Sequence, residues 1–335
     1  MTTRVPDVTA HPFAKGHGAG NDFIVLPDPD GQLVLSAGDV TRLCDRRTGI
    51  GADGILRAVR CAADPEAAAM AAQAEWFMDY RNADGSNGAM CGNGIRVLAR
   101  YLVDAALCLP GTLPIATRAG IRRVHVPHRS PAFQGPVTVS MGHPELPDTA
   151  GAEVAVAERR WAACHVDMGN PHAVVFVDDL AHAGDLRASP TVGPADAYPL
   201  GVTVEFVVDR GPGHLALRVH ERGVGETQAC GTGACAAVAA AMRRAARPAP
   251  AHYIVDAPGG RLSVEVLPDG AMKLTGPAAI VAQGTTGLTL SRSAWGTDSP
   301  YPQSPRTGPD STGAYVAYSR NSYSGIVSTP GHTPM

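Results

Sequence analysis

Short apolar runs bounded by glycine- and proline-rich turns dominate the chain, and this pattern predicts strands. The expected strands lie at or within residues 13–26, 49–56, 76–81, 113–126, 137–141, 161–168, 173–177, 202–209, 215–221, 253–255, 261–266 and 272–274. Helices are predicted directly after Cys91 and Cys230, with shorter ones through residues 40–45 and across the alanine-rich residues 64–75. Many strands with one well-marked helix in each half favour an α+β fold over a parallel βαβ sheet.

The two well-marked helices are each part of the same longer construction. A polar loop runs into Cys-Gly-x-Gly and then into a helix, first at Cys91 and again at Cys230. Upstream of each Cys, a Gly-Asn pair stands directly before an apolar run. The Asn of the pair is Asn21 in the first half and Asn170 in the second. The separations are 91 − 21 = 70 and 230 − 170 = 60 residues. Equal order and similar spacing predict a duplicated domain with two thiols facing each other across a cleft.

Composition narrows the class of protein. A chain of 335 residues can form two domains with sizeable cores, and a net charge of −3 favours neither nucleic acid nor an anionic membrane as partner. The first residues lack the basic start and the following apolar segment of a secretory signal, so we expect none. No apolar run reaches the length of a membrane span. The seven Cys have no disulfide or zinc spacing, so we expect free thiols in a reducing cytoplasm and no metal. Residues 295–335 are poor in periodic apolar positions and are expected to form a disordered tail.

A Cys at the start of a helix lies where unpaired N–H groups and the helix dipole favour negative charge. Such a thiol is expected to lose its proton more easily, and the neighbouring N–H groups can hold a carboxylate. Taken alone, a Cys before a glycine-rich helix start is more often a buried small apolar residue. The repetition of the motif is what favours a chemical role.

Two opposed thiols have three common uses, which are metal binding, disulfide redox chemistry and acid–base catalysis. Metal binding needs further soft ligands at compatible spacing, and the sequence offers none. Redox pairs usually share one short motif, whereas these thiols are 230 − 91 = 139 residues apart. Acid–base catalysis fits best, because one thiolate can remove a proton from a carbon while the opposed thiol returns one to the other face. This scheme inverts a stereocentre and requires no cofactor.

Five motifs follow one another along the chain: GHGAGNDF (residues 16–23), RNADGS (81–86), MCGNG (90–94), MGNPH (168–172) and ERGVGETQACGTG (221–233). Together they closely resemble the diaminopimelate epimerase family, especially its high-G+C actinobacterial form, over about residues 13–284. The resemblance implies two pseudo-symmetric α+β domains, each a strand barrel around a central helix, at residues 13–136 and 137–275, with 276–290 returning to the first. It also implies interconversion of LL- and meso-2,6-diaminopimelate without pyridoxal phosphate, for lysine and cell-wall precursors.

The resemblance assigns a role to each matching residue. Cys91 and Cys230 match the acid–base thiols, and His172 is placed beside them. Substrate contacts are expected from Asn21, Asn82, Gly92, Asn93, Asn170, Thr203, Glu221, Arg222, Gly231 and Thr232. Arg222 and Asn82 match positions at the distal end, where a planar guanidinium can pair with a carboxylate. We expect a cytoplasmic homodimer whose partner is a small-molecule amino-acid substrate.

Two departures from the family pattern leave alternatives open. Thr203 stands where the family usually has Asn, and its shorter side chain offers one hydroxyl instead of an amide. This difference is compatible with a racemase of the same fold that acts on another amino acid. The polar C-terminal segment raises the question of how the first domain is closed, and it keeps a non-catalytic thiol-redox homologue as a third possibility.

Overall fold

The computed structural model describes residues 11–128, 135–147, 152–194, 197–199, 201–287 and 291–292. The backbone contacts of the described residues group them in one compact unit. The tail expected at residues 295–335 lies outside the described residues.

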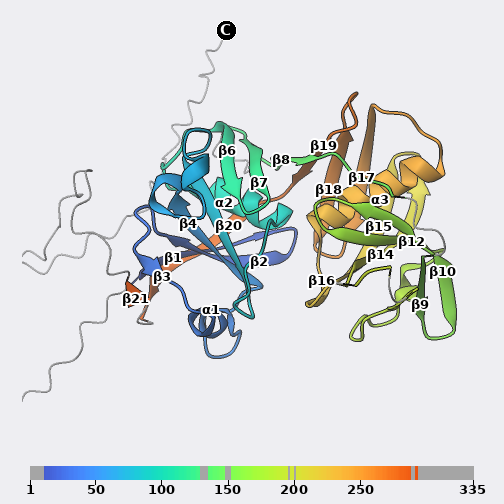
Figure 1. Cartoon of the computed structure of the whole chain (residues 1–335), viewed down its shortest axis with the longest axis horizontal. Coiled ribbons are helices and arrows are strands. Elements are labelled where there is room, and N and C mark those ends of the chain that lie inside the picture. The colour runs from blue at the N-terminus through green and yellow to red at the C-terminus, as the bar shows by residue number, and fades with distance from the viewer. Residues whose placement is uncertain are drawn as a thin grey trace, which may run out of the picture. The chain divides into compact units, whose positions relative to one another are not determined.

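Most of the described chain is strand (Figure 1). The strands are β1 (His11–Gly18), β2 (Asn21–Pro27), β3 (Leu33–Val34), β4 (Gly54–Arg60), β5 (Trp76–Asn82), β6 (Gly111–Thr117), β7 (Gly120–Val126), β8 (Val137–Gly142), β9 (Glu153–Val156), β10 (Arg159–Ala162), β11 (Cys164–Asp167), β12 (Pro171–Phe176), β13 (Thr191–Gly193), β14 (Thr203–Gly211), β15 (His214–Glu221), β16 (Gly225–Thr227), β17 (Ala251–Ala257), β18 (Gly260–Val266), β19 (Met272–Gly276), β20 (Ala279–Thr286) and β21 (Ser291–Arg292). Sixteen of them form one sheet in the order β11-β12-β14-β15-β17-β18-β19-β8-β7-β6-β5-β4-β2-β1-β20, with β16 beside β15. The predicted α+β fold is confirmed.

The α-helices are α1 (Ala37–Cys44), α2 (Gly92–Asp104) and α3 (Gly231–Arg244), joined by the short 3₁₀ helices η1 (Cys61–Ala63), η2 (Ala68–Met70) and η3 (Leu180–Ala183). The helix predicted over residues 64–75 is wrong, because this stretch forms turns and η2 only. Alanine has high helix propensity, but a short helix needs an apolar face to pack, and the run offers the core only Ala67, Ala74 and the partly buried Met70.

Helices α2 and α3 each occupy the centre of one half of the sheet (Figure 1). Every residue of α2 from Gly92 to Leu102 is buried, and its neighbours include β1, β2, β7 and β8. Helix α3 consists largely of Ala and packs against β11, β12, β14 and β15. A helix buried on all sides by strands is held at a fixed depth, which fixes where its N-terminus lies.

Two strands connect the halves of the sheet. Strand β8 pairs with β7 on one side and with β19 on the other. Strand β20 follows the second half and pairs antiparallel with β1, from His11↔Thr286 to His17↔Ala279. The segment that closes the first half is therefore present despite the polar C-terminal sequence. The domain boundaries after residues 136 and 275 stay a prediction.

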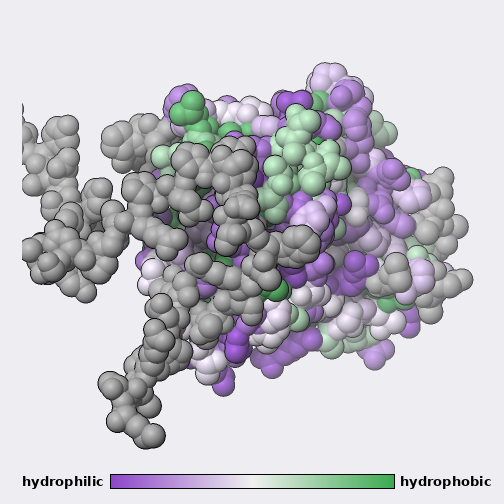
Figure 2. Space-filling model, turned by 60° about the vertical axis from the view of Figure 1, so that its left-hand side comes forward, coloured by the Kyte–Doolittle hydropathy of each residue, from purple (hydrophilic) through white to green (hydrophobic). Residues whose placement is uncertain are grey.

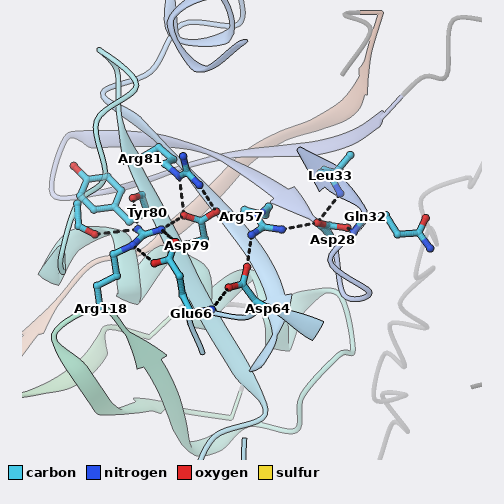
Figure 3. A network of polar contacts seen from close by, with 11 residues as sticks. Asp28, Gln32, Leu33, Arg57, Asp64, Glu66, Asp79, Tyr80, Arg81 and Arg118 are labelled. Carbon is cyan, nitrogen blue, oxygen red and sulfur yellow. Dashed lines mark hydrogen bonds and ion pairs between the residues drawn. The ribbon is translucent and has the colours of Figure 1, made fainter. Parts of the chain in front are cut away.

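A buried network of charges joins β4 and β5 (Figure 3). Arg57 binds Asp79 at 2.8 Å and Asp28 at 2.9 Å and also contacts Asp64, and all four side chains are at most 9% exposed. Asp79 is shared with Arg118, which is 2.6 Å away. Because each buried charge has an opposite partner, the network fixes the register of the strand that ends at Asn82.

None of the helices in the described ranges is long and apolar enough to cross a bilayer. On the face shown in Figure 2, hydrophilic and near-neutral residues prevail and green, hydrophobic residues lie in small groups. Exposed large apolar side chains are few among the described residues: Val34, Leu107, Leu109, Val224 and Val281.

Candidate active site

Each of the two motif cysteines is the N-cap of a buried helix. The Cys91 Sγ accepts a hydrogen bond from the Gly94 N–H at 3.3 Å, and the Cys230 Sγ accepts one from the Gly233 N–H at 3.4 Å. Both Cys have extended backbone angles, as a residue that begins a helix requires. The thiols thus replace the Ser or Thr hydroxyl that usually caps a helix.

The N-termini of α2 and α3 meet. A methyl group added at Gly231 would lie 2.9 Å from the Leu274 Cδ2 and 3.2 Å from the Gly92 Cα, so the close approach of the two helices depends on glycine at position 231. The Asn93 side chain donates to the Ala229 carbonyl at 2.7 Å, which ties the first turn of α2 to the residue before Cys230. The first-turn N–H groups of two helices therefore point into one region, where an anion is favoured.

A cavity of about 300 Å³ lies at this junction. Both thiols line it, together with the residues predicted to bind substrate: Asn21, Asn82, Gly92, Asn93, Asn170, Thr203, Glu221, Arg222, Gly231 and Thr232. His172 is the one predicted site residue outside the cavity lining. Segments from both halves of the chain thus converge on one polar cavity.

Residues of the first half are held by amide and hydroxyl contacts. The Asn21 side chain donates to Asp53 at 2.6 Å, while its carbonyl oxygen accepts from Asn93 at 3.3 Å and lies 3.8 Å from the Cys91 sulfur. Asn82 accepts from the Tyr80 hydroxyl at 2.6 Å. These contacts fix the orientation of both amides before any ligand is bound.

Residues of the second half lie along β14 and the turn after β15. Thr203 is 4% exposed, and its hydroxyl oxygen accepts a hydrogen bond from the Arg222 backbone N–H at 3.4 Å. The Thr227 hydroxyl donates to Glu221 at 2.5 Å. The Met168 N–H donates to the Asn170 carbonyl at 3.1 Å and closes the Gly-Asn turn. Thr203 therefore supports the turn that carries Arg222.

His172 lies behind the cavity and pairs with Glu205. The His172 Nδ1 is 2.6 Å from the Glu205 Oε1, and both side chains are fully buried. The parallel pairing of β12 with β14 brings them together, because His172 is the register partner of Thr203. Glu205 reaches α3, since a methyl group on Gly233 would lie 2.6 Å from its Oε1. His172 is thus a neighbour of the α3 N-terminus through Glu205.

The loop that precedes Cys91 is anchored by Arg118 (Figure 3). This guanidinium donates to the Tyr80 carbonyl at 2.9 Å and to the Gly88 carbonyl at 3.2 Å, and it pairs with Asp79. Gly88 packs directly on the Tyr80 ring, where a methyl group would lie 2.1 Å from the ring carbon Cδ1. The buried charges of β4 and β5 therefore position the segment that delivers Cys91.

The expectation of acidified thiols is wrong for this site. Burial raises the pKa of Cys91 to about 11, in spite of the Gly94 N–H, which lowers it. Burial also raises the pKa of Cys230 well above its usual value, and Glu221 and Glu205 raise it further. Desolvation and nearby carboxylates disfavour a thiolate more strongly than the helix N-termini favour it. Both cysteines are free thiols.

Several residues of the site were not predicted from the sequence. The cavity is also lined by Tyr80, Asn87, Met90, Arg122, Met168, Val224 and Ala229. Most of these lie within or beside the five motifs, so proximity to a motif could have identified them. Arg122 lies on β7, outside every motif, and only the fold brings it to the cavity. Within the described ranges, no cluster of His, Cys, Asp and Glu side chains is arranged to hold a metal ion.

The chain matches the family model for diaminopimelate epimerase over residues 13–147 and 164–281. A diaminopimelate epimerase from Streptomyces coelicolor is 56% identical over 289 residues, which cover 85% of this chain and 96% of that protein. A diaminopimelate epimerase from Thermobifida fusca is 45% identical over 284 residues, which cover 84% of this chain and 99% of that protein.

Solved structures at low identity share the fold. A phenazine biosynthesis protein of the PhzF family from Bacillus anthracis has a TM-score of 0.60 at 16% identity, covering 83% of this chain and 99% of that one. A hydroxyproline epimerase from Agrobacterium vitis, solved with trans-4-hydroxy-L-proline, has a TM-score of 0.59 at 16% identity, covering 84% and 93%. With the matched family model and relatives of this similarity, the chain belongs to the diaminopimelate epimerase family.

Proposed function

We propose that this chain interconverts LL- and meso-2,6-diaminopimelate, with Cys91 and Cys230 as the two acid–base groups. The observation that carries the proposal is the pair of thiols capping two helices whose N-termini meet at one cavity. Inversion at carbon needs a proton acceptor on one face and a proton donor on the other, and two opposed thiols supply both. The family relationship supports the choice of substrate.

The proton balance is simple. The thiolate of one Cys takes the α-proton, and the C–H bond on that face breaks. The thiol of the other Cys gives its proton to the opposite face, where a new C–H bond forms. The enzyme is left with thiol and thiolate exchanged between Cys91 and Cys230, ready for the reverse direction.

The helix N-termini would stabilise the charge that develops on the reacting end of the substrate. The α-carboxylate would accept hydrogen bonds from the backbone N–H groups of Gly92, Asn93, Gly231 and Thr232. As the α-carbon loses its proton, negative charge spreads onto this carboxylate, and donors already in place stabilise it without reorganisation. Removing one such donor in comparable sites costs roughly 100- to 1,000-fold in rate.

Substrate binding also accounts for how a thiol with a raised pKa can react. The α-ammonium group of the amino acid brings a positive charge next to the buried thiols. An opposite charge within about 4–6 Å favours the ionised form of a neighbouring group. The thiol would therefore stay protonated in the free enzyme and would lose its proton to water only when the substrate binds, which limits side reactions of a thiolate.

The distal end of the substrate would be bound by polar side chains from both halves. Arg222 would pair with the distal carboxylate, with Asn82 beside it. Asn21, Asn170, Thr203 and Glu221 would orient the chain and the amino groups. His172 would act indirectly, by holding Glu205 behind α3. We further propose a cytoplasmic homodimer that works without pyridoxal phosphate in lysine and peptidoglycan precursor synthesis.

The test measures exchange of the α-proton by nuclear magnetic resonance. Purified, reduced protein is incubated with LL-diaminopimelate in D2O, and loss of the α-proton signal is followed together with formation of the meso isomer. We expect both for the wild type, and neither for Cys91→Ala or Cys230→Ala. Cys235→Ala, a buried thiol outside the cavity, serves as the control and should keep its turnover. A fast wild-type reaction with another amino acid and none with diaminopimelate would refute the proposed substrate.

A further inference from the structure

Arg122 is a charged residue that the strand pattern turns toward the interior. It lies on β7 two and four residues before Val124 and Val126, and alternate residues of a strand share a face. Val124 and Val126 are fully buried in the core cluster that contains Ile95 and Leu98 of α2. Arg122 therefore faces the side of β7 that α2 occupies, and it lines the cavity with both thiols.

The side chain of Arg122 has no partner among the described residues. Its Nε atom is buried and makes no hydrogen bond. Burial lowers the pKa of Arg122, as expected for a cation that loses water and gains no anion. Arg118, four residues earlier, is by contrast saturated by Glu66, Asp79 and two backbone carbonyls. A partly desolvated guanidinium without a counter-ion costs stability, and such a cost is typical of a ligand site.

The substrate offers one anionic group that matches this cation. Among the described residues that line the cavity, only Arg122 and Arg222 are basic. The helix N-termini at Gly92 and Gly231 already serve the α-carboxylate of the reacting end. We propose that Arg122 binds the distal carboxylate of the substrate and so selects a dicarboxylic amino acid, with Arg222 contributing from the other half of the chain. This inference rests on the proposed function.

The kinetic test compares two neighbouring arginines. Arg122→Met removes the cation from the cavity, whereas Arg123→Met removes the same charge from the exposed face of β7 and is the matched control. For Arg122→Met we expect KM for LL-diaminopimelate to rise roughly 10- to 100-fold with kcat changed little, because the distal end is bound alike in ground and transition states. Arg122→Lys should recover part of the loss. The melting temperature of Arg122→Met should equal or exceed that of the wild type, because an uncompensated charge is removed.

A pair of inhibitors tests which carboxylate Arg122 binds. Heptanedioate has carboxylates at both ends and heptanoate at one, and each is measured as an inhibitor that competes with the substrate. Arg122→Met should weaken inhibition by heptanedioate and leave heptanoate unchanged. Equal weakening of both, or an Arg122→Met enzyme with the KM of Arg123→Met, would overturn this inference while the wild type stays active. A wild type that fails to epimerise diaminopimelate would overturn the proposed function and this inference with it.

Discussion

Gly233→Ala tests whether the buried Glu205 carboxylate is locked behind α3. The added methyl group would lie 2.6 Å from the Glu205 Oε1 and 3.3 Å from its Cδ. A carboxylate at a flexible surface could turn away, but Glu205 is fully buried and its Oε1 is 2.6 Å from the His172 Nδ1. The added methyl group would overlap the position that the Glu205 Oε1 must keep to stay hydrogen-bonded to His172. The backbone N–H of residue 233 stays in place, so the contact to Cys230 is not removed directly.

The expected loss of stability is the balance of two effects. Breaking a buried pair costs about 3–5 kcal/mol. Alanine inside a helix is about 1 kcal/mol more favourable than glycine. The free energy of unfolding of Gly233→Ala should therefore fall by about 2–4 kcal/mol. For a chain of this size that corresponds to a drop in the thermal midpoint of roughly 3–7 °C.

Gly94→Ala in α2 is the matched control. Gly94 occupies the same position after Cys91 that Gly233 occupies after Cys230. A methyl group there would meet the Leu56 Cδ2 at 3.0 Å and the Phe23 Cζ at 3.5 Å. Moving a leucine methyl costs about 0.5–1.5 kcal/mol, which the gain in helix propensity of about 1 kcal/mol offsets. The thermal midpoint of this variant should stay close to that of the wild type.

The assay is thermal unfolding of both variants and the wild type, followed by circular dichroism at one pH and one protein concentration. The prediction is that Gly233→Ala melts well below Gly94→Ala. If the two variants melt within roughly 2 °C of each other, the Glu205 carboxylate is free to move and the reasoning from its buried hydrogen bond is refuted.

Three further predictions concern the site and its support. Thr203→Asn should lower KM for diaminopimelate about tenfold by restoring an amide contact to a charged group, and an unchanged KM would make Thr203 a neutral variation. Alkylation of Cys91 by iodoacetamide in the free enzyme should accelerate steadily from pH 7 to 10, because its pKa is raised to about 11; a plateau near pH 8 would contradict this. Burial alone would raise the pKa of Asp79, but neighbouring arginines lower it from 3.8 to about 2. The ionised Asp79 carboxylate therefore stabilises the fold fully above pH 3.8, and this contribution is lost as the pH falls through about 2. Asp79→Asn should make the melting temperature depend less on pH in this acid range.

Much of the site could be predicted because its chemistry is local in the sequence. A Cys that caps a helix and the glycines that follow it lie within a few residues, so one motif fixes both the thiol and its N–H donors. The Gly-Asn turns at Asn21 and Asn170 are likewise local. Strands were predicted well wherever apolar runs ended at turn residues, as in the hairpin of β6 and β7.

What could not be predicted depends on contacts between distant segments. The pKa of a thiol depends on how deeply it is buried and on which carboxylates come near it, and Cys91 and Cys230 differ in both from an isolated helix start. The pairing of His172 with Glu205 needs the parallel register of β12 and β14. Arg122 has no motif around it and reaches the cavity only because β7 packs beside α2.

The two thiols have equivalent positions in the fold but different charged neighbours. Both cap a central helix and both accept one N–H hydrogen bond, as the duplicated construction requires. The carboxylates of Glu205 and Glu221 both oppose ionisation of Cys230, whereas Cys91 is opposed by Glu221 and favoured by Arg96. The fold therefore repeats the capped thiol, and the charged groups packed around each copy are what distinguish the two.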